Sequence, residues 1–104
     1  MAVVAVGREG DVQPDRPLRV VVNGVPIAIF SVHDELYAIG DTCTHEEYSL
    51  SDGEMVDDYV VECALHGAQF DVRTGEALCL PATEPTPSYP VWVEDGAIKV
   101  DVED

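Results

Sequence analysis

The sequence predicts an all-β protein, built as a small antiparallel sandwich or barrel. Short runs rich in β-branched residues recur along the chain, and turn-forming glycine, proline, asparagine and aspartate separate them. The dipeptide Asn23-Gly24 is a strong hairpin signal, because both central residues of such a turn must accept positive φ. Apolar residues do not recur with a 3.6-residue period over any long segment, so we assign no α-helix.

In the first part of the chain, the expected strands are Val3–Val6, Leu18–Val22, Val25–Val32 and Leu36–Ile39. Pro26 lies near the start of the third strand, where a missing N–H is best tolerated. A polar turn that contains His33 precedes the fourth strand, and we expect this histidine to be solvated. A loop that runs from Gly40 to Gly53 follows the fourth strand.

The second part of the chain contains three expected strand pairs: Met55-Val56 with Tyr59–Val61, Phe70–Val72 with Glu76–Leu78, and Tyr89–Val93 with Ala97–Val102. Prolines between residues 81 and 90 stiffen the connection before the last pair, because proline fixes φ and cannot donate to a ladder. Trp92 lies in an expected terminal strand, and we expect its side chain in the core.

Length and charge restrict the classes of function. A chain of 104 residues, 46% of them apolar, supports one globular domain. The 21 acidic and 5 basic residues give a formal charge of −16, which excludes nucleic acid as a natural partner because binding to phosphate depends on lysine and arginine. Basic proteins are the expected partners, since an acidic face can steer them into contact.

Three cysteines do not suit a disulfide framework, because they cannot all be paired within one chain. The first residues, Met1 to Gly7, lack the basic segment of a signal peptide and are too short to span a membrane. We therefore expect a cytoplasmic protein without a membrane anchor. Cys79 is expected to pack within a small apolar strand.

Two short motifs carry the chemistry. Cys43 and His45 form a Cys-x-His pair, and Cys63 and His66 form a Cys-x-x-His pair after a connection that a hairpin can span. One tight loop can aim each pair at a common metal centre. Two thiolates and two imidazoles suit either a tetrahedral zinc ion or an iron–sulfur centre.

These four residues and the runs that follow them resemble a Rieske ferredoxin. The matching runs are Leu50-Ser51-Asp52-Gly53 and Gly67-Ala68-Gln69-Phe70-Asp71-Val72-Arg73-Thr74-Gly75-Glu76, and the similarity covers essentially the whole chain. The resemblance implies one [2Fe-2S] cluster, with Cys43 and Cys63 on the buried iron and His45 and His66 on the outer iron. Ala64, where many relatives have proline, and the acidic pair Glu46-Glu47 depart from the usual pattern.

The resemblance also implies an architecture and a role. Residues 1–104 would form a single Rieske domain, a small antiparallel base with an inserted cluster-binding subdomain at approximately residues 41–80. The protein would carry single electrons from a ferredoxin reductase, expected to be a flavoprotein, to a terminal oxygenase of a bacterial aromatic-ring-hydroxylating dioxygenase system. It would be an electron carrier rather than an enzyme, with no direct small-molecule substrate and a low reduction potential.

An acidic group follows or adjoins the first ligand loop and predicts a docking face for a basic surface on the oxygenase. Its members are Asp41, Glu46, Glu47, Asp52, Glu54, Asp57 and Asp58. Two other functions are compatible with parts of the pattern: a structural zinc module of an interaction protein, and the small subunit of an assimilatory nitrite reductase. The full ligand set argues against the latter, and the red-brown colour of a Rieske cluster distinguishes it from colourless zinc.

Overall fold

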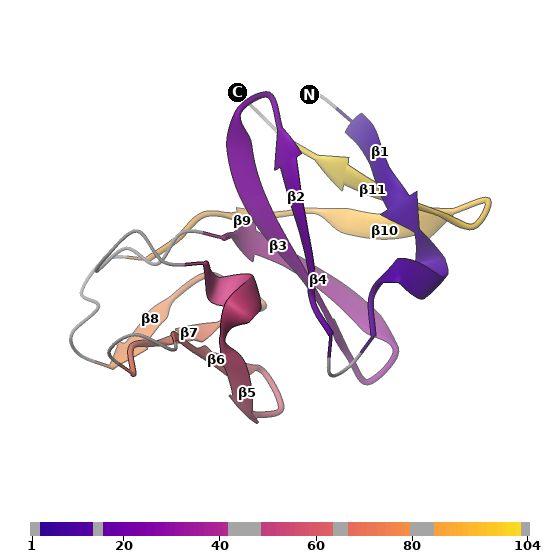
Figure 1. Ribbon diagram of the computed structural model, residues 1–104. Coiled ribbons are helices and arrows are strands. Elements are labelled where there is room, and N and C mark those ends of the chain that lie inside the picture. The colour runs from indigo at the N-terminus through magenta and orange to yellow at the C-terminus, as the bar shows by residue number, and fades with distance from the viewer. Residues whose placement is uncertain (1–2, 14–15, 42–48, 64–66, 80–84, 103–104) are drawn as a thin grey trace.

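The computed structural model describes residues 3–13, 16–41, 49–63, 67–79 and 85–102. Within them, eleven strands form three antiparallel sheets (Figure 1). The strands are β1 (Val3–Arg8), β2 (Leu18–Val22), β3 (Val25–Val32), β4 (Glu35–Gly40), β5 (Glu54–Asp57), β6 (Val60–Glu62), β7 (Gln69–Asp71), β8 (Ala77–Cys79), β9 (Ser88–Tyr89), β10 (Val91–Glu94) and β11 (Ala97–Asp101). Two short 3-10 helices, η1 (Glu9–Asp11) and η2 (Leu50–Asp52), complete these elements.

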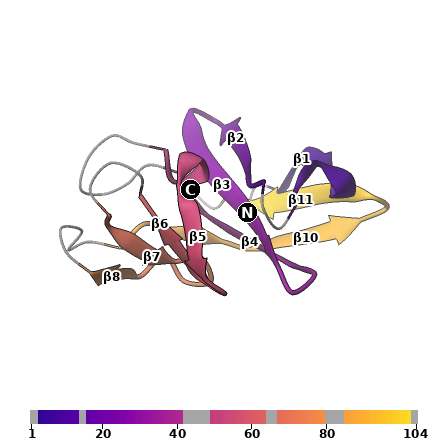
Figure 2. The ribbon, with the colours of Figure 1, turned by 60° about the horizontal axis from the view of Figure 1, so that its bottom comes forward.

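The three sheets have the strand orders β1-β11-β10, β2-β3-β4-β9 and β5-β6-β7-β8. The second sheet lies between the other two in both ribbon views (Figures 1 and 2). The first two sheets form the base. The third holds β5 and β6, which lie between the two motif loops, and β7 and β8, which follow the second loop. This arrangement confirms the predicted all-β fold with an antiparallel base and an inserted subdomain.

Strand β3 contributes to two hydrophobic cores. Ile27 and Ile29 belong to the core of the base, together with residues of β11. Ala28 and Phe30 belong to a second core, which is shared with the third sheet. Successive side chains of a strand point to opposite faces, so a strand covered on both faces must be apolar throughout. This requirement explains why residues 25–32 form a nearly continuous apolar run.

The hairpin turns follow the predicted chemistry. Asn23 and Gly24 join β2 to β3 with φ values of 51° and 81°, as a type I′ turn requires. His33 and Asp34 adopt the same left-handed conformation between β3 and β4, with φ values of 51° and 66°. His33 is exposed to solvent, as predicted.

The predicted strand Tyr89–Val93 is wrong in one respect, because two strands occupy this region. Tyr89 pairs with Ala38 in the second sheet, whereas Val91 pairs with Val100 in the first. Pro90, between them, has no N–H to donate, and its carbonyl accepts a hydrogen bond from the amide of Asp101 at 3.0 Å. The chain therefore changes sheets at this proline. The other predicted strands agree with the structure to within one or two residues.

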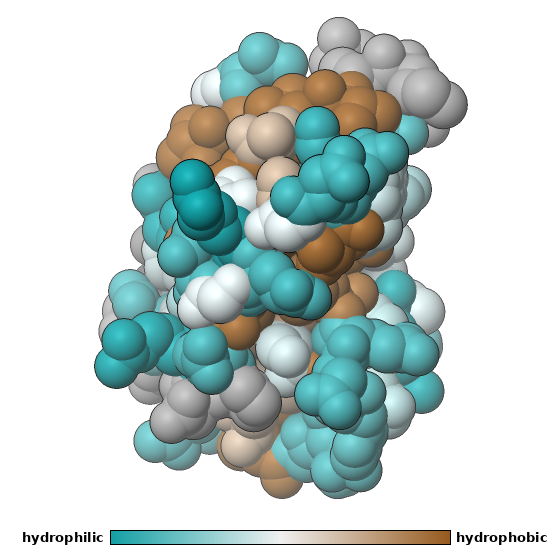
Figure 3. Space-filling view, turned by 90° about the vertical axis from the view of Figure 1, so that its right-hand side faces the viewer, coloured by the Kyte–Doolittle hydropathy of each residue, from teal (hydrophilic) through white to brown (hydrophobic). Residues whose placement is uncertain are grey.

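The prediction that Trp92 lies in the core is wrong, because 37% of the residue is exposed. Val91 packs against the core of the base, so alternation along β10 turns the next side chain outward. The face that carries the β10–β11 hairpin is mixed: hydrophilic side chains cover much of its middle and lower part, and a broad hydrophobic area crosses its upper part (Figure 3). In the described part of the chain, no helix has the length and apolarity needed to cross a membrane.

Candidate metal centre

Cys63 is the one predicted ligand that lies within the described residues; Cys43, His45 and His66 lie outside them. Cys63 directly follows β6, and only 2% of its surface is exposed. It belongs to the core cluster that includes Val61. A thiolate in such apolar surroundings is stable only where positive charge compensates it, as a ferric ion would.

The second motif loop is closed at its base by hydrogen bonds. The amide of Cys63 donates to the carbonyl of Ala68 at 2.7 Å, and the amide of Gly67 donates to the carbonyl of Cys63 at 3.0 Å. Gly67 has a φ of +75°, which glycine adopts without steric strain. The chain therefore reverses within a few residues, as a loop that presents a thiol and an imidazole to one centre must.

The ends of the first motif loop are joined through Asp41. Its carbonyl accepts a hydrogen bond from the amide of Leu50 at 2.6 Å, and its Oδ1 accepts one from the amide of Ser51 at 2.9 Å. Its Oδ2 lies 2.9 Å from Nε of Arg19 on β2. The described residues on either side of segment 42–48 are thus hydrogen-bonded to each other.

Gly53 brings the two loops together. It lies between η2 and β5, where a Cβ atom would collide with the carbonyl oxygen of Glu62. Glu62 immediately precedes Cys63 and pairs in register with Glu54. The exit of the first loop and the entrance of the second therefore lie at the same end of adjacent strands, as the sequence predicted.

Thr86 fastens the third sheet to the base. Its amide donates to the carbonyl of Gly75 at 2.8 Å, and its Oγ1 donates to the carbonyl of Gly40 at 3.2 Å. Neither glycine has room for a Cβ atom beside Thr86. This buried threonine therefore ties the end of β4, where the first loop begins, to the turn between β7 and β8.

The donor set and this framework fit an iron–sulfur group. A buried cysteine stands where one loop begins, and hydrogen bonds close both loops at adjacent points. No group of three or more metal-binding side chains is found among the described residues, from which three of the four predicted ligands are missing. The geometry of the complete ligand set therefore stays a prediction.

The structure revises the predicted acidic docking face. Asp41 is only 1% exposed and is hydrogen-bonded, so it does not belong to that face. Asp57 and Asp58 lie at the far end of the β5–β6 hairpin, about 10 Å of strand away from the loops. Asp52 and Glu54 are exposed beside the exit of the first loop, and Glu46 and Glu47 lie outside the described residues.

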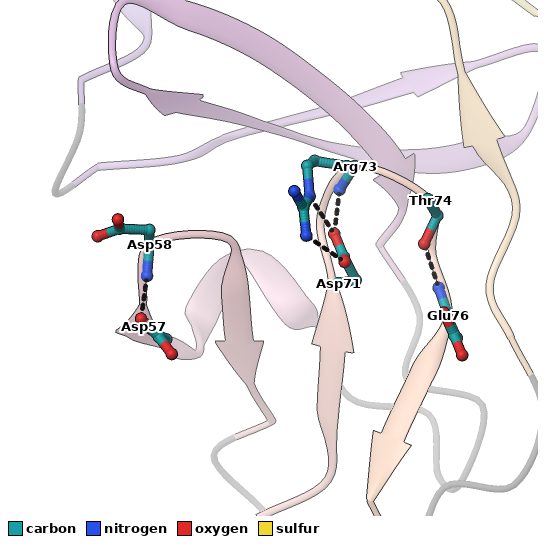
Figure 4. A network of polar contacts seen from close by, with 6 residues as sticks. All are labelled: Asp57, Asp58, Asp71, Arg73, Thr74 and Glu76. Carbon is teal, nitrogen blue, oxygen red and sulfur yellow. Dashed lines mark hydrogen bonds and ion pairs between the residues drawn. The ribbon is translucent and has the colours of Figure 1, made fainter.

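Polar contacts connect residues at the distal turns of the third sheet (Figure 4), and aromatic contacts extend this cluster to the base. Arg73 binds Asp71 through Nη2 and Oδ2 at 2.9 Å, and its guanidinium lies 4.1 Å from the ring centroid of Tyr59. The hydrogen bonds from Arg73 hold the pKa of the Asp71 carboxyl below its usual value. Tyr37 meets Tyr59 edge-on, and its hydrogen bond to Glu35 raises the pKa of Tyr37 to about 12. These contacts brace the subdomain at the end remote from the loops.

Residues 2–90 match the family described as the Rieske [2Fe-2S] domain. Over 92 residues the chain is 50% identical to the 3-phenylpropionate/cinnamic acid dioxygenase ferredoxin subunit of Escherichia coli (strain K12). The matched segment covers 88% of this chain and 86% of that protein. The ferredoxin of carbazole 1,9a-dioxygenase from Nocardioides aromaticivorans IC177 has the same fold, with a TM-score of 0.91 and 32% identity over 99% of this chain and 100% of that one.

A further solved structure is described as a complex of reduced oxygenase and oxidized ferredoxin in carbazole 1,9a-dioxygenase. The chain matches it with a TM-score of 0.86 and 39% identity, over 94% of this chain and 91% of that one. These similarities confirm the resemblance that the sequence motifs indicated. The chain therefore belongs to the Rieske [2Fe-2S] family.

Proposed function

We propose that this protein is the soluble ferredoxin component of an aromatic-ring-hydroxylating dioxygenase system, in which it carries single electrons from a reductase to a terminal oxygenase. The similarity over most of both chains to a dioxygenase ferredoxin subunit is the observation that carries this proposal. As a Rieske protein it binds one [2Fe-2S] cluster, which supplies one-electron redox chemistry when bound. The protein is thus a carrier and not an enzyme by itself.

Cys43 and Cys63 are the proposed ligands of the buried iron, and His45 and His66 those of the outer iron. The burial of Cys63 supports its place on the inner side. The hydrogen bonds that close both loops support a ligand set held in a fixed arrangement. Residues 1–104 act as one Rieske domain in this proposal, with residues 41–80 as the cluster-binding subdomain.

The proposed partners are a ferredoxin reductase, expected to be a flavoprotein, and an oxygenase with a basic docking face. Exposed carboxylates at Asp52 and Glu54 support this choice, because they stand beside the exit of the first loop. The charge of −16 opposes binding to nucleic acid. Transfer between such components is proposed to take place in the cytoplasm, with no direct small-molecule substrate for this chain.

Reconstitution tests the function. Protein produced with iron available should be red-brown and contain two irons and two acid-labile sulfides per chain, as a Rieske cluster requires. Added to a matching reductase, NADH and a ring-hydroxylating oxygenase, it should restore product formation that stops when it is omitted. Stoichiometric zinc without labile sulfide would instead identify a structural zinc module, and a cluster-containing protein that never reduces an oxygenase would reject the carrier role.

The reduction potential is expected near the lower end of the Rieske range of about −150 to +300 mV. High-potential relatives have a disulfide between the ligand loops and hydroxyl donors to the sulfides, whereas this chain has Glu46-Glu47 and Ala64-Leu65 in the loops and Ala68 where serine is frequent. Nothing at these positions withdraws charge from the sulfides. Protein-film voltammetry checks the value, and a midpoint above about +150 mV would contradict the low-potential assignment.

Electron transfer to and from the partners should slow as salt increases. Raising ionic strength from 0.01 to 0.1 M shortens the Debye length from about 30 to about 10 Å, which screens attraction between an acidic face and a basic partner. Glu46→Gln combined with Glu47→Gln should reproduce part of this loss, mainly in the association rate, because rim charges steer encounter. Stopped-flow reduction by the reductase measures both effects.

The matched control for that pair is Glu94→Gln combined with Asp95→Asn, which removes the same charge at the β10–β11 turn. The control should leave most of the salt dependence intact. A rate that does not respond to salt, and is equal in both double variants, would show that the acidic residues near the first loop are only a solvated surface.

A further inference from the structure

We infer that Asp41 and Arg19 act together as positioning residues for the cluster, with Asp41 closing the first ligand loop and the ion pair setting the local charge that tunes the reduction potential. This inference rests on the proposed function, because it takes Cys43 and His45 in that loop as ligands. It assigns a role to a pair of residues from β2 and from the end of β4 that are 22 positions apart in the sequence.

Every polar group of Asp41 forms a hydrogen bond. Its amide donates to the carbonyl of Pro26 at 3.0 Å, and its carbonyl accepts from the amide of Leu50 at 2.6 Å. Its two carboxylate oxygens accept from the amide of Ser51 and from Nε of Arg19, each at 2.9 Å. One residue thus connects two strands of the base to both ends of the loop.

Because it is buried, the Asp41 side chain depends on its partners. The side chain of Asp41 is 1% exposed, and a buried carboxylate is tolerated only when it is paired and hydrogen-bonded. The Arg19 side chain is 49% exposed, so one end of the pair stays in contact with water. A loop anchor needs only the hydrogen bonds to Leu50 and Ser51. The arginine adds a positive charge that loop closure alone does not require.

The pair is close enough to influence a metal centre. Asp41 is two residues from Cys43 in the sequence, so the covalent chain keeps its carboxylate near the proposed site. A fixed charge near a partly buried site acts on it more strongly than it would in water. The negative carboxylate disfavours addition of an electron to the cluster, and the guanidinium offsets that effect.

Substitutions at the two positions should shift the potential in opposite directions. Asp41→Asn removes the negative charge and keeps an oxygen for the Ser51 amide, so the midpoint potential should rise. Arg19→Gln leaves the carboxylate uncompensated, so the potential should fall. Asp95→Asn, at the β10–β11 turn, and Arg16→Gln, at another exposed arginine, are matched controls that should leave the potential within error of the wild type.

Loop closure has a separate readout. Asp41→Ala removes both carboxylate hydrogen bonds, and hydrogen bonds to a charged group are among the stronger ones in proteins. Loss of visible absorbance in the presence of an iron chelator should therefore be about tenfold faster or more in this variant, which corresponds to about 1.4 kcal/mol. Asp41→Asn should lie between the alanine variant and the wild type.

The outcomes separate this inference from the proposed function. A wild-type protein without a [2Fe-2S] cluster would reject the function itself. A wild-type protein with the cluster, together with potentials that do not move or that move in the same direction for Asp41→Asn and Arg19→Gln, would overturn the tuning role alone. If Asp41→Asn fails to fold, Arg19→Gln, at a half-exposed side chain, still decides the direction against Arg16→Gln.

Discussion

Cys63→Ser protein is expected to be purified without colour and with almost no acid-labile sulfide. Cys63 is buried directly after β6, where a thiolate can neutralise ferric charge inside an apolar core. A serine hydroxyl is a harder donor that is rarely ionised, so it does not replace the thiolate on an iron–sulfur centre. Loss of this ligand should weaken metal binding by more than the roughly 10–100-fold that removal of an outer-shell partner costs.

Cys43→Ser should have the same result, whereas Cys79→Ser should retain the cluster. All three variants exchange one sulfur for one oxygen, so the third controls for the chemical change itself. Iron and sulfide analysis, together with the visible spectrum, measures the outcome. A Cys63→Ser protein with normal iron and sulfide content, or a Cys79→Ser protein that has lost both, would show that the ligand assignment is wrong.

Gly53→Ala should strongly destabilise the protein. The new Cβ would overlap the carbonyl oxygen of Glu62, and because that atom belongs to the backbone, no side-chain rotation relieves the collision. The strands β5 and β6 must separate to accommodate it. We expect a cost of about 3 kcal/mol and a fall in melting temperature of more than about 10 °C for a domain of this size.

Gly10→Ala is the matched control, because a Cβ at that glycine would meet no atom within 4 Å. Its melting temperature should stay within a few degrees of the wild type or rise slightly, since alanine restricts the unfolded chain. Circular dichroism at one fixed scan rate compares the proteins, and the cluster content of each is measured beforehand. Equal melting curves for the two variants would mean that the loops do not depend on the close approach at Gly53.

The hairpins were predictable because local chemistry determines them. Asn23-Gly24 imposes the turn between β2 and β3, and the two strands begin and end at the predicted residues. The sheet change at Pro90 differs from the single strand predicted there, although the missing N–H of a proline within an apolar run is a signal for it. Trp92 was misplaced because a large aromatic residue suggests burial, while the face that it occupies depends on which neighbour of β10 points inward.

In the candidate site, too, features set by the local sequence were predictable and features set by distant contacts were not. Spacing and residue type identify the four proposed ligands, since a thiol and an imidazole recur within each short motif. The burial of Asp41 could not be predicted, because its partner Arg19 is distant in sequence and an aspartate beside a ligand loop also suits an exposed rim. The role of Thr86 left no sequence signal, since its contacts depend on two glycines that only the folded chain brings near it.

The position of β3 between two cores also determines how the molecule can come apart. Ile29 and Phe30 are successive residues, yet one side chain belongs to the base and the other to the core that contains Cys63. Melting of either core would uncover one face of the same strand and weaken its hold on the other. Among the described residues, the base and the third sheet therefore share β3 and have no boundary between them at which one could detach without exposing this strand. Hydrogen exchange at the amides of β3 should report a single opening event for both halves.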